Sequence, residues 1–335
     1  MASIRDVAEM AGVSISTVSR VITGSANVES GTRARVEEAI RETKYRPNLN
    51  ARSLRSRSGQ LVGLALPKII HETFSTIIHY AEQEAHKMGY GLIIGNTEDD
   101  PERERAFIDD LLSRNVDAIV FSRVSDASQL PEGARERGLP IVVIDRVIEH
   151  ETITSIETDN REAGRLVANL FLKGGHRNIG TVTGPKNVRS VRERDAGFMN
   201  TLEAAGIEMP SAQHLEGNFE FDSGVSAAEA FLELAELPTA IWAQCDLAAV
   251  GLLRRFSQAG VRVPEDVSLV GMDNVPISKM LVPSLTTVDQ PFEEFCRRAF
   301  HIIHHQLEDP SYQPPERVLQ IRPSIVIRES YRNLE

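Results

Sequence analysis

One short stretch of the chain, residues 4–24, carries side chains whose types and spacing suit contact with DNA. Val18 and Val21 share one face of a helix at the period of about 100° per residue. Ser16 and Arg20 lie on the opposite face. A serine hydroxyl can contact either type of base or a phosphate, and an arginine can clamp guanine or a phosphate. Such a helix could lie in a DNA major groove, although the same period is typical of a surface helical hairpin.

Two short helices joined by a tight turn would position these side chains. Ile4, Val7 and Ala11 fall at helical spacing, and Gly12 follows them. A glycine at this place predicts the end of a first helix. Ser14 can then cap a second helix by accepting a hydrogen bond from one of its free amides.

A third helix and a basic linker follow this pair. The helix is expected from about Thr32 to Lys44, and Pro47 ends the helical region. About 45 residues bury only a small core, so we expect this headpiece to be marginally stable alone. A helix of under two turns, such as Asn48–Arg55 would form, is unstable in water because nucleation is costly. The linker is therefore expected to be flexible without DNA.

The composition indicates a basic head on an acidic body. The chain has 335 residues, which predicts two or three domains, and its 41% hydrophobic content argues against disorder. Its formal net charge of −11 does not by itself suggest a nucleic-acid partner. However, the first 58 residues contain ten Lys and Arg and six Asp and Glu, a net charge of +4, which leaves −15 for the rest. The phosphate-binding surface is therefore expected at one end.

Cysteine usage and the start of the chain predict a soluble cytoplasmic protein. Cys245 and Cys296 lack the spacing of a metal site, so we expect buried, reduced thiols and neither a metal nor a cofactor. Arg5, Asp6 and Glu9 interrupt the apolar run that a secretion signal needs. No segment approaches the roughly 20 apolar residues that would span a membrane.

From Leu61 onward, short apolar runs alternate with amphipathic helical patterns. The predicted strands are Leu61–Leu66, Gly91–Asn96, Ala118–Phe121, Ile141–Ile144, Ile179–Thr183, Ala240–Ala243 and Val267–Met272. The predicted helices are Phe74–Met88, Glu102–Arg114, Arg161–Lys173, Arg192–Ala205, Ser223–Leu234 and Leu247–Ala259. This alternation predicts two doubly wound α/β lobes, divided near Thr158, with ligands bound at the carboxyl ends of the strands. The sequence has no dinucleotide fingerprint after the first strand and no P-loop.

The stretch IRDVAEMAGVSISTVSRVI resembles the headpiece of the lac repressor (LacI/GalR-type) family, whose pattern runs DVA..AGVS..TVSRV. The match covers residues 6–8, 11–14 and 17–21 without a gap. The resemblance implies that the second helix reads the major groove, with Ile15, Ser16 and Arg20 as the base-reading set. The positions that it assigns to DNA contact here are Ser14, Ile15, Ser16, Thr17, Ser19 and Arg20.

The next segment, YRPNLNARSLRS, resembles the hinge of the same family, YxPNxxAxxL. In that family the hinge helices of two subunits pair in the minor groove, and a leucine wedges between the central base pairs. Leu54 matches this leucine, and such wedging kinks DNA at a cost of a few kcal/mol per step. The resemblance assigns DNA contacts here to Asn48, Ala51, Leu54 and Arg55.

The rest of the chain resembles the effector domain of the family, which is similar to periplasmic sugar-binding proteins. Segments VVIDR, RERDAGF, VPEDVSLVGMDN and PSLTTVDQPFEE carry this resemblance. The expected fold is α/β: an all-α helix-turn-helix headpiece (1–46), a hinge (47–58) and a two-lobed, periplasmic-binding-protein-like core (59–335). Lobe 1 is expected at about 59–158 and 288–318, and lobe 2 at about 159–287 and 319–335.

The resemblance also implies a ligand site between the lobes. The matching positions are Phe74, Asp145, Arg194, Phe219, Cys245, Asp273 and Gln290. Carboxylates that accept from hydroxyl groups, an arginine fork and an aromatic face suit a polyol. Taken singly, Asp145 and Asp273 could cap turns, and Arg194 could pair with Glu193 or Asp195. Phe74 and Phe219 could simply belong to the core.

Two features of the sequence leave the chemical class of the ligand undecided. The family often has Asn where this chain has Cys245, and a thiol is only a weak hydrogen-bond donor. Lys186, Arg189 and Arg192 could attract an anionic ligand such as a sugar acid or sugar phosphate, although ordinary surface charge is the favoured explanation for them.

The sequence thus predicts a homodimeric, ligand-responsive repressor of sugar metabolism or transport genes, bound to a palindromic operator. The alternative is a sugar-binding receptor of the transport type without gene control. An enzyme is not expected, because the sequence has neither a nucleotide-binding fingerprint nor a spaced acid–base pair.

Overall fold

A computed structural model describes residues 2–22, 28–45, 59–122, 137–147 and 153–334. The chain divides into two compact units, Met1–Gln60 and Leu61–Glu335. Each unit is described below by itself. None of the helices in these described ranges has the length and apolar character needed to cross a lipid bilayer.

The described part of the N-terminal unit contains three helices around a miniature core. They are α1 (Ile4–Ala11), α2 (Ile15–Ile22) and α3 (Ser30–Thr43). Ser3 caps α1, and Gly12 ends it with φ at 63°, as predicted. The core consists of small apolar side chains from all three helices: Val7, Ala8, Ala11, Val18, Val21, Val36 and Ala39.

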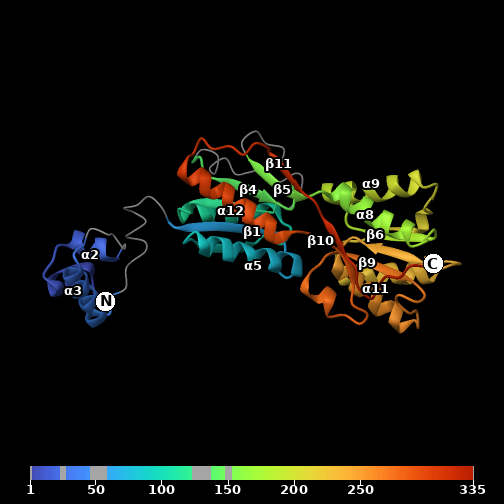
Figure 1. Cartoon of the computed structure of the whole chain (residues 1–335), viewed down its shortest axis with the longest axis horizontal. Helices are drawn as coiled ribbons and strands as arrows, with labels where there is room; N and C mark the ends of the chain where they lie inside the picture. Colours follow the sequence, from blue (N-terminus) through green and yellow to red (C-terminus); the bar gives the residue numbers. More distant parts are fainter. Residues whose placement is uncertain (1, 23–27, 46–58, 123–136, 148–152, 335) are drawn as a thin grey trace. The chain divides into compact units, whose positions relative to one another are not determined.

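The larger unit contains two sheets, and each belongs to one lobe. In the first lobe the strand order is β11-β5-β4-β3-β1-β2, and all neighbours are parallel. The strands are β1 (Leu61–Leu66), β2 (Gly91–Asn96), β3 (Ala118–Phe121), β4 (Ile141–Ile144), β5 (Thr154–Thr158) and β11 (Val318–Ile321). Helices α5 (Glu72–Lys87) and α12 (Phe292–Glu308) share one core cluster with the sheet, and α6 (Pro101–Ser113) packs with a second. Figure 1 shows α5 and α12 beside β1.

In the second lobe the strand order is β12-β10-β9-β8-β6-β7, and only β12 is antiparallel to its neighbour. The strands are β6 (Ile179–Thr183), β7 (His214–Glu216), β8 (Ala240–Ala243), β9 (Ser268–Asp273), β10 (Thr286–Asp289) and β12 (Ser324–Val326). The helices are α8 (Asn160–Lys173), α9 (Arg189–Ala204), α10 (Phe221–Leu232) and α11 (Asp246–Gln258), with short 3-10 turns η1 (Ser211–Gln213) and η2 (Pro276–Lys279). Helices α8 and α9 pack with one core cluster, and α10 and α11 with another. Parallel strands covered in this way explain the continuous apolar runs of the sequence.

In the described residues the chain crosses between the lobes three times: from β5 to α8, from β10 to α12 and from β11 to β12. The expected division at residues 288 and 319 is therefore misplaced by a few residues. Thr286–Asp289 pairs with β9 in the second lobe. Val318–Ile321 pairs with β5 and so extends the first sheet. These strand pairings keep the chain in each lobe longer than expected.

Candidate ligand pocket and nucleic-acid interface

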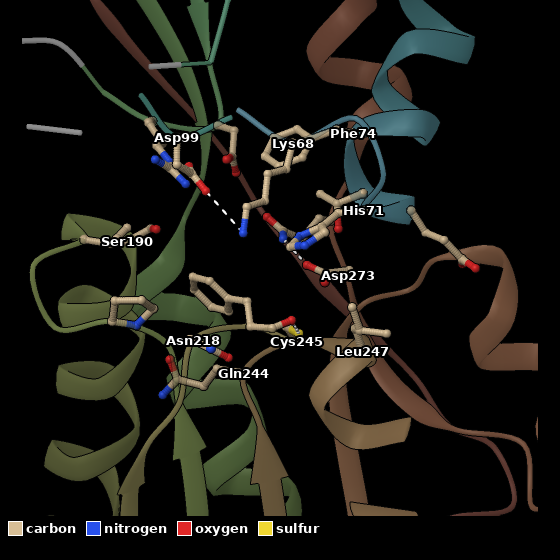
Figure 2. A pocket seen from close by; sticks show the side chains of 18 of the residues that line it. Lys68, His71, Phe74, Asp99, Ser190, Asn218, Gln244, Cys245, Leu247 and Asp273 are labelled. Carbon is tan, nitrogen blue, oxygen red and sulfur yellow. Dashed lines mark hydrogen bonds and ion pairs between the residues drawn. The ribbon is translucent and has the colours of Figure 1, made fainter. Parts of the chain in front are cut away.

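A cavity of about 460 Å³ lies between the two lobes of the larger unit, lined by residues of both. Figure 2 shows Lys68, His71 and Phe74 on one side and Asn218, Gln244 and Cys245 on the other. The cavity meets the carboxyl ends of strands in both sheets, as expected for a doubly wound fold. All seven positions predicted from the sequence line it: Phe74, Asp145, Arg194, Phe219, Cys245, Asp273 and Gln290.

Arg194 places a buried guanidinium beside the cavity, with only 4% of the residue exposed. Its Nε donates to Asn160 Oδ1 at 2.7 Å, and its Nη1 donates to the carbonyl of Gln244 at 3.3 Å. Within the described residues, Nη2 has no hydrogen-bond partner and the guanidinium has no ion pair. Burial lowers the pKa of Arg194, while the charges of Asp273 and Asp145 act in the opposite direction.

The alternative partners considered for Arg194 are engaged elsewhere. Glu193 accepts from Arg189 at 3.0 Å, and Asp195 bonds His214 at 2.7 Å. The position of Arg194 follows from close packing of α8 on α9. A Cβ added at Gly164 would lie 2.0 Å from the main-chain oxygen of Arg194. The two helix backbones therefore touch at this point.

Asp273 and Gln290 form a buried pair at the ends of β9 and β10. Gln290 Nε2 donates to Asp273 Oδ1 at 2.6 Å, and Thr158 donates to Gln290 Oε1 at 2.8 Å. Burial raises the pKa of Asp273 to about 6, even though the charge of Arg194 and the bond from Gln290 favour the carboxylate. Asp145, which follows β4 of the first lobe, also lines the cavity.

Cys245 and Phe219 interact with each other on the second-lobe wall. The Cys245 thiol donates to the carbonyl of Phe219 at 3.2 Å, and its sulfur accepts from the amide of Ala248 at 3.3 Å. Burial raises the pKa of this thiol. The ring of Phe219 lies on Gly184, where an added Cβ would be 2.1 Å from the ring. The thiol is thus hydrogen-bonded to the protein at the wall of the cavity.

Phe74 has both of the roles considered for it. It is buried in the core cluster of the first lobe and also lines the cavity.

Sequence reasoning missed several residues that line the cavity, among them Lys68, His71, Glu72 and Gln244. Lys68 follows β1, so the carboxyl-end rule could have found it. Gln244 is 1% exposed, and both atoms of its amide lack a hydrogen-bond partner among the described residues. The same described ranges contain no group of three or more His, Cys, Asp or Glu side chains that could hold a metal ion.

The basic residues suggested for an anionic ligand do not line the cavity. Lys186 pairs with Glu216 at 3.7 Å, Arg189 pairs with Glu193, and Arg192 donates to the carbonyl of Lys186. Each of these three cations therefore has a partner within the second lobe.

In the N-terminal unit, α2 presents the predicted polar face. The hydroxyl of Ser14 accepts from the amide of Thr17 at 3.2 Å, which confirms Ser14 as the cap. Val18 and Val21 are buried, while Ser16 and Arg20 are exposed. Ile15, Thr17 and Ser19 are half-buried along the same helix. The predicted hinge contacts Asn48, Ala51, Leu54 and Arg55 lie outside the described residues.

Comparisons with known proteins cover both units. Residues 3–48 match the family described as "Bacterial regulatory proteins, lacI family", and residues 168–331 match "Periplasmic binding protein-like domain". The HTH-type transcriptional repressor PurR of Photobacterium profundum is 34% identical over 335 residues, covering 100% of both chains. The protein of the same name from Vibrio atlanticus is 33% identical with the same coverage.

Solved structures of transcriptional regulators are similar to both units of the chain. The lac repressor dimer bound to operator and the anti-inducer ONPF is similar with a TM-score of 0.85 and 26% identity, covering 98% of each chain. The complex of the transcriptional regulator CelR with cellobiose has a TM-score of 0.72 and 28% identity, covering 99% of this chain and 100% of the other.

These similarities extend over the headpiece as well as the lobes, so a receptor of the transport type without gene control does not account for the chain. Proteins with this combination of domains respond to ligands and repress transcription by binding DNA, and they are not enzymes. From headpiece to last strand, the sequence belongs to the LacI family of bacterial regulatory proteins.

Proposed function

We propose that this repressor acts as a homodimer on a palindromic operator and that a sugar or sugar derivative, bound between its lobes, sets its DNA affinity. The genes under its control would serve sugar metabolism or transport. The observation that carries this proposal is the buried guanidinium of Arg194, which lines a cavity and has no ion pair within the described residues.

The chemistry of the cavity favours a polyhydroxylated effector. A buried charge without a partner is costly, so a ligand oxygen that accepts from Arg194 Nη2 would be strongly favoured. Asp145 and Asp273 add carboxylate acceptors for ligand hydroxyl groups, and Phe219 offers an aromatic face for the apolar side of a sugar ring. The structural relative that holds cellobiose supports the same class of ligand.

Exposed apolar side chains support the dimer. Met280 and Val282 of the second lobe are 69% and 96% exposed, and Ile94 on the edge strand β2 is 42% exposed. An unpaired apolar edge strand is a site for pairing with another chain. The proposed cover is a second copy of this chain, in line with the dimer of the lac repressor structure.

The exposed face of α2 would read the operator. Two headpieces on a two-fold dimer would contact half-sites about one helical turn apart, with Ile15, Ser16 and Arg20 toward the bases. Leu54 would wedge into the minor groove between them. Because bacterial DNA lies in the cytoplasm, we place the action of the protein there.

A thermal-shift screen of the full-length protein tests the effector. The screen would contain sugars, sugar acids, sugar phosphates and nucleobases. A compound that binds the folded state raises the melting temperature by mass action, and the same compound should change operator affinity in a mobility-shift titration. If only nucleobases raised the melting temperature, the sugar proposal would be wrong. If no operator palindrome were preferred over random duplex, the regulatory proposal would fail as a whole.

A further inference from the structure

One carboxylate of the second lobe is held by two side chains of the first lobe. Lys68 Nζ lies 2.7 Å from Glu220 Oε1, and His71 Nε2 lies 3.2 Å from Glu220 Oε2. Lys68 and His71 stand between β1 and α5, whereas Glu220 immediately precedes α10. Each oxygen of Glu220 therefore contacts a different residue across the cavity between the lobes.

These groups are half-buried and electrostatically matched. The hydrogen bond to Glu220 raises the pKa of Lys68. Burial alone would raise the pKa of Glu220, but the hydrogen bond from Lys68 and the charge of His71 outweigh it and lower the pKa. Lys68 and Glu220 thus favour each other's charged forms.

The second-lobe side of this contact is fixed by its own backbone. Phe219 adopts a positive φ of 69°, and the amide of Glu220 donates to Asn218 Oδ1 at 3.0 Å. The carbonyl of Glu220 accepts from the hydroxyl of Ser223 in the first turn of α10. Glu220 therefore projects from a constrained turn.

A second carboxylate gives Lys68 an alternative partner. Asp99 Oδ2 lies 3.6 Å from Lys68 Nζ and belongs to the same lobe as Lys68. Figure 2 shows this contact as a dashed line at the cavity. If the lobes separate, Lys68 loses Glu220 but keeps Asp99, so opening does not leave an unpaired ammonium group.

We propose that Lys68, His71 and Glu220 form a latch that holds the two lobes together over the cavity when no effector is bound. The latch rests on the proposed function, because it regulates access to the proposed effector site. Lys68 and His71 line the cavity, so an effector that contacts either residue competes with Glu220. Glu220 is thus a positioning residue: it acts on the effector site through the two side chains that it holds.

The strength of the contact suits a reversible latch. A half-exposed ion pair changes the equilibrium between the open and closed arrangements of the lobes by only about 2- to 5-fold. A second cross-lobe bond, from the amide of Ile277 to Glu72 Oε2 at 3.1 Å, adds to the same closure. Loss of either charge in the Lys68–Glu220 pair should therefore raise the open population by about the same factor without unfolding the protein.

The two cysteines of the chain allow this to be measured without any effector. Cys245 is buried and lines the cavity, while Cys296 is buried in the core of the first lobe. Full-length protein would be treated with iodoacetamide, and alkylation of each cysteine would be followed by mass spectrometry of peptides. Opening of the cavity raises the rate at Cys245 alone, whereas general destabilisation raises the rate at both.

We expect Glu220→Gln and Lys68→Met each to increase the ratio of the Cys245 rate to the Cys296 rate by about 2- to 5-fold. Lys68→Met matters because, among the described residues, the hydrogen bonds and ion pairs of Lys68 are to Glu220 and Asp99, so that Glu220 links it to the turn that holds Cys245. The double variant should show no increase beyond that of Glu220→Gln, since Glu220→Gln already removes the charge that Lys68 pairs with. Glu216→Gln, which removes a carboxylate paired with Lys186 within the second lobe, should leave the ratio unchanged.

An unchanged ratio in the single variants, additive effects in the double variant, or a parallel rise at both cysteines would each overturn the latch. The experiment uses no effector. Its failure therefore leaves the effector screen unaffected, and a failed screen leaves this result unaffected.

Discussion

Gln290 donates a hydrogen bond of 2.6 Å to Asp273 and so ties the segment that crosses from β10 to α12 to the end of β9. Both residues line the cavity, and Gln290 also accepts from Thr158, at the end of β5, where the chain first crosses between the lobes. Two of the three crossings are thus joined to the wall of the cavity. Substitutions at Asp273 or Gln290 should therefore change the free energy of unfolding as well as the affinity for the ligand.

The first prediction concerns the pH dependence of stability through Asp273. Its pKa is raised from 3.8 to about 6 in the folded protein, so the folded state binds a proton that the unfolded state has released. The contribution is fully present below about pH 3.8 and is lost as the pH rises through about 6. A shift of this size corresponds to on the order of 3 kcal/mol. Denaturant unfolding of the wild type and of Asp273→Asn at several pH values would measure it, because the Asn side chain does not titrate. The two proteins should be about equally stable at low pH, and the wild type should become less stable than Asp273→Asn as the pH rises through about 6. A difference independent of pH would contradict the prediction.

The second prediction compares two buried glutamines of the cavity. Gln244 has no hydrogen-bond partner for its amide within the described residues, whereas both ends of the Gln290 amide are bonded. Gln244→Leu should therefore raise the free energy of unfolding by about 1–2 kcal/mol, because an uncompensated buried amide is removed. Gln290→Leu should lower it by about 2–4 kcal/mol, because it leaves Thr158 and Asp273 without their partner. Denaturant unfolding of both variants, measured in parallel, should show changes of opposite sign in the free energy of unfolding. A loss of stability in both variants would contradict the prediction.

The third prediction separates effector binding from DNA binding. Arg194→Lys keeps a positive charge but removes the planar fork that reaches Asn160, Gln244 and the cavity. We expect effector affinity to fall by at least about 10-fold and operator affinity without effector to stay unchanged. Calorimetry with a compound from the thermal-shift screen would give the first value and a mobility-shift titration the second. Normal effector uptake by the variant would exclude Arg194 as the ligand clamp.

The fourth prediction addresses the exposed face of α2. Arg20→Ala should weaken operator binding by about 1–3 kcal/mol relative to random duplex, as expected for the loss of a base-reading contact. Arg41→Ala removes the same charge from α3, where Arg41 pairs with Glu38, and provides the matched control. It should weaken binding to both duplexes alike and leave their ratio unchanged. Equal ratios for the two variants in titrations at one salt concentration would show that Arg20 does not read bases.

Much of the fold could be predicted from the sequence, because fully buried parallel strands are short continuous apolar runs. Six predicted strands, among them Leu61–Leu66 and Ala240–Ala243, have the bounds found in the structure, and the seventh is displaced by one residue. Among the strands that were missed, β5, β7 and β10 are mostly polar. Thr154–Thr158 is buried throughout, yet it carries Glu157, whose carboxylate accepts from Gln320 on the neighbouring strand. Periodicity cannot identify a strand whose burial depends on such a partner.

For the candidate pocket, too, some residues could be predicted from the sequence and others could not. Asp145 and Asp273 could be found because polar residues after buried strands gather at one edge of a sheet. Lys68 and Glu220 are 152 residues apart and lie in different lobes, so no local pattern relates them. The unpartnered amide of Gln244 is likewise a property of its surroundings, not of its place in the sequence.

The contact of the α8 and α9 backbones at Gly164 has a consequence for how this protein could change its ligand. Any side chain at that glycine would push α9 outward and carry Arg194 with it, because the added atom would meet the main chain itself. The position of the Arg194 guanidinium therefore cannot be shifted in small steps by substitutions at Gly164. A new chemical preference must instead arise among the side chains that face it, which are free to vary in size and polarity while the guanidinium stays in place.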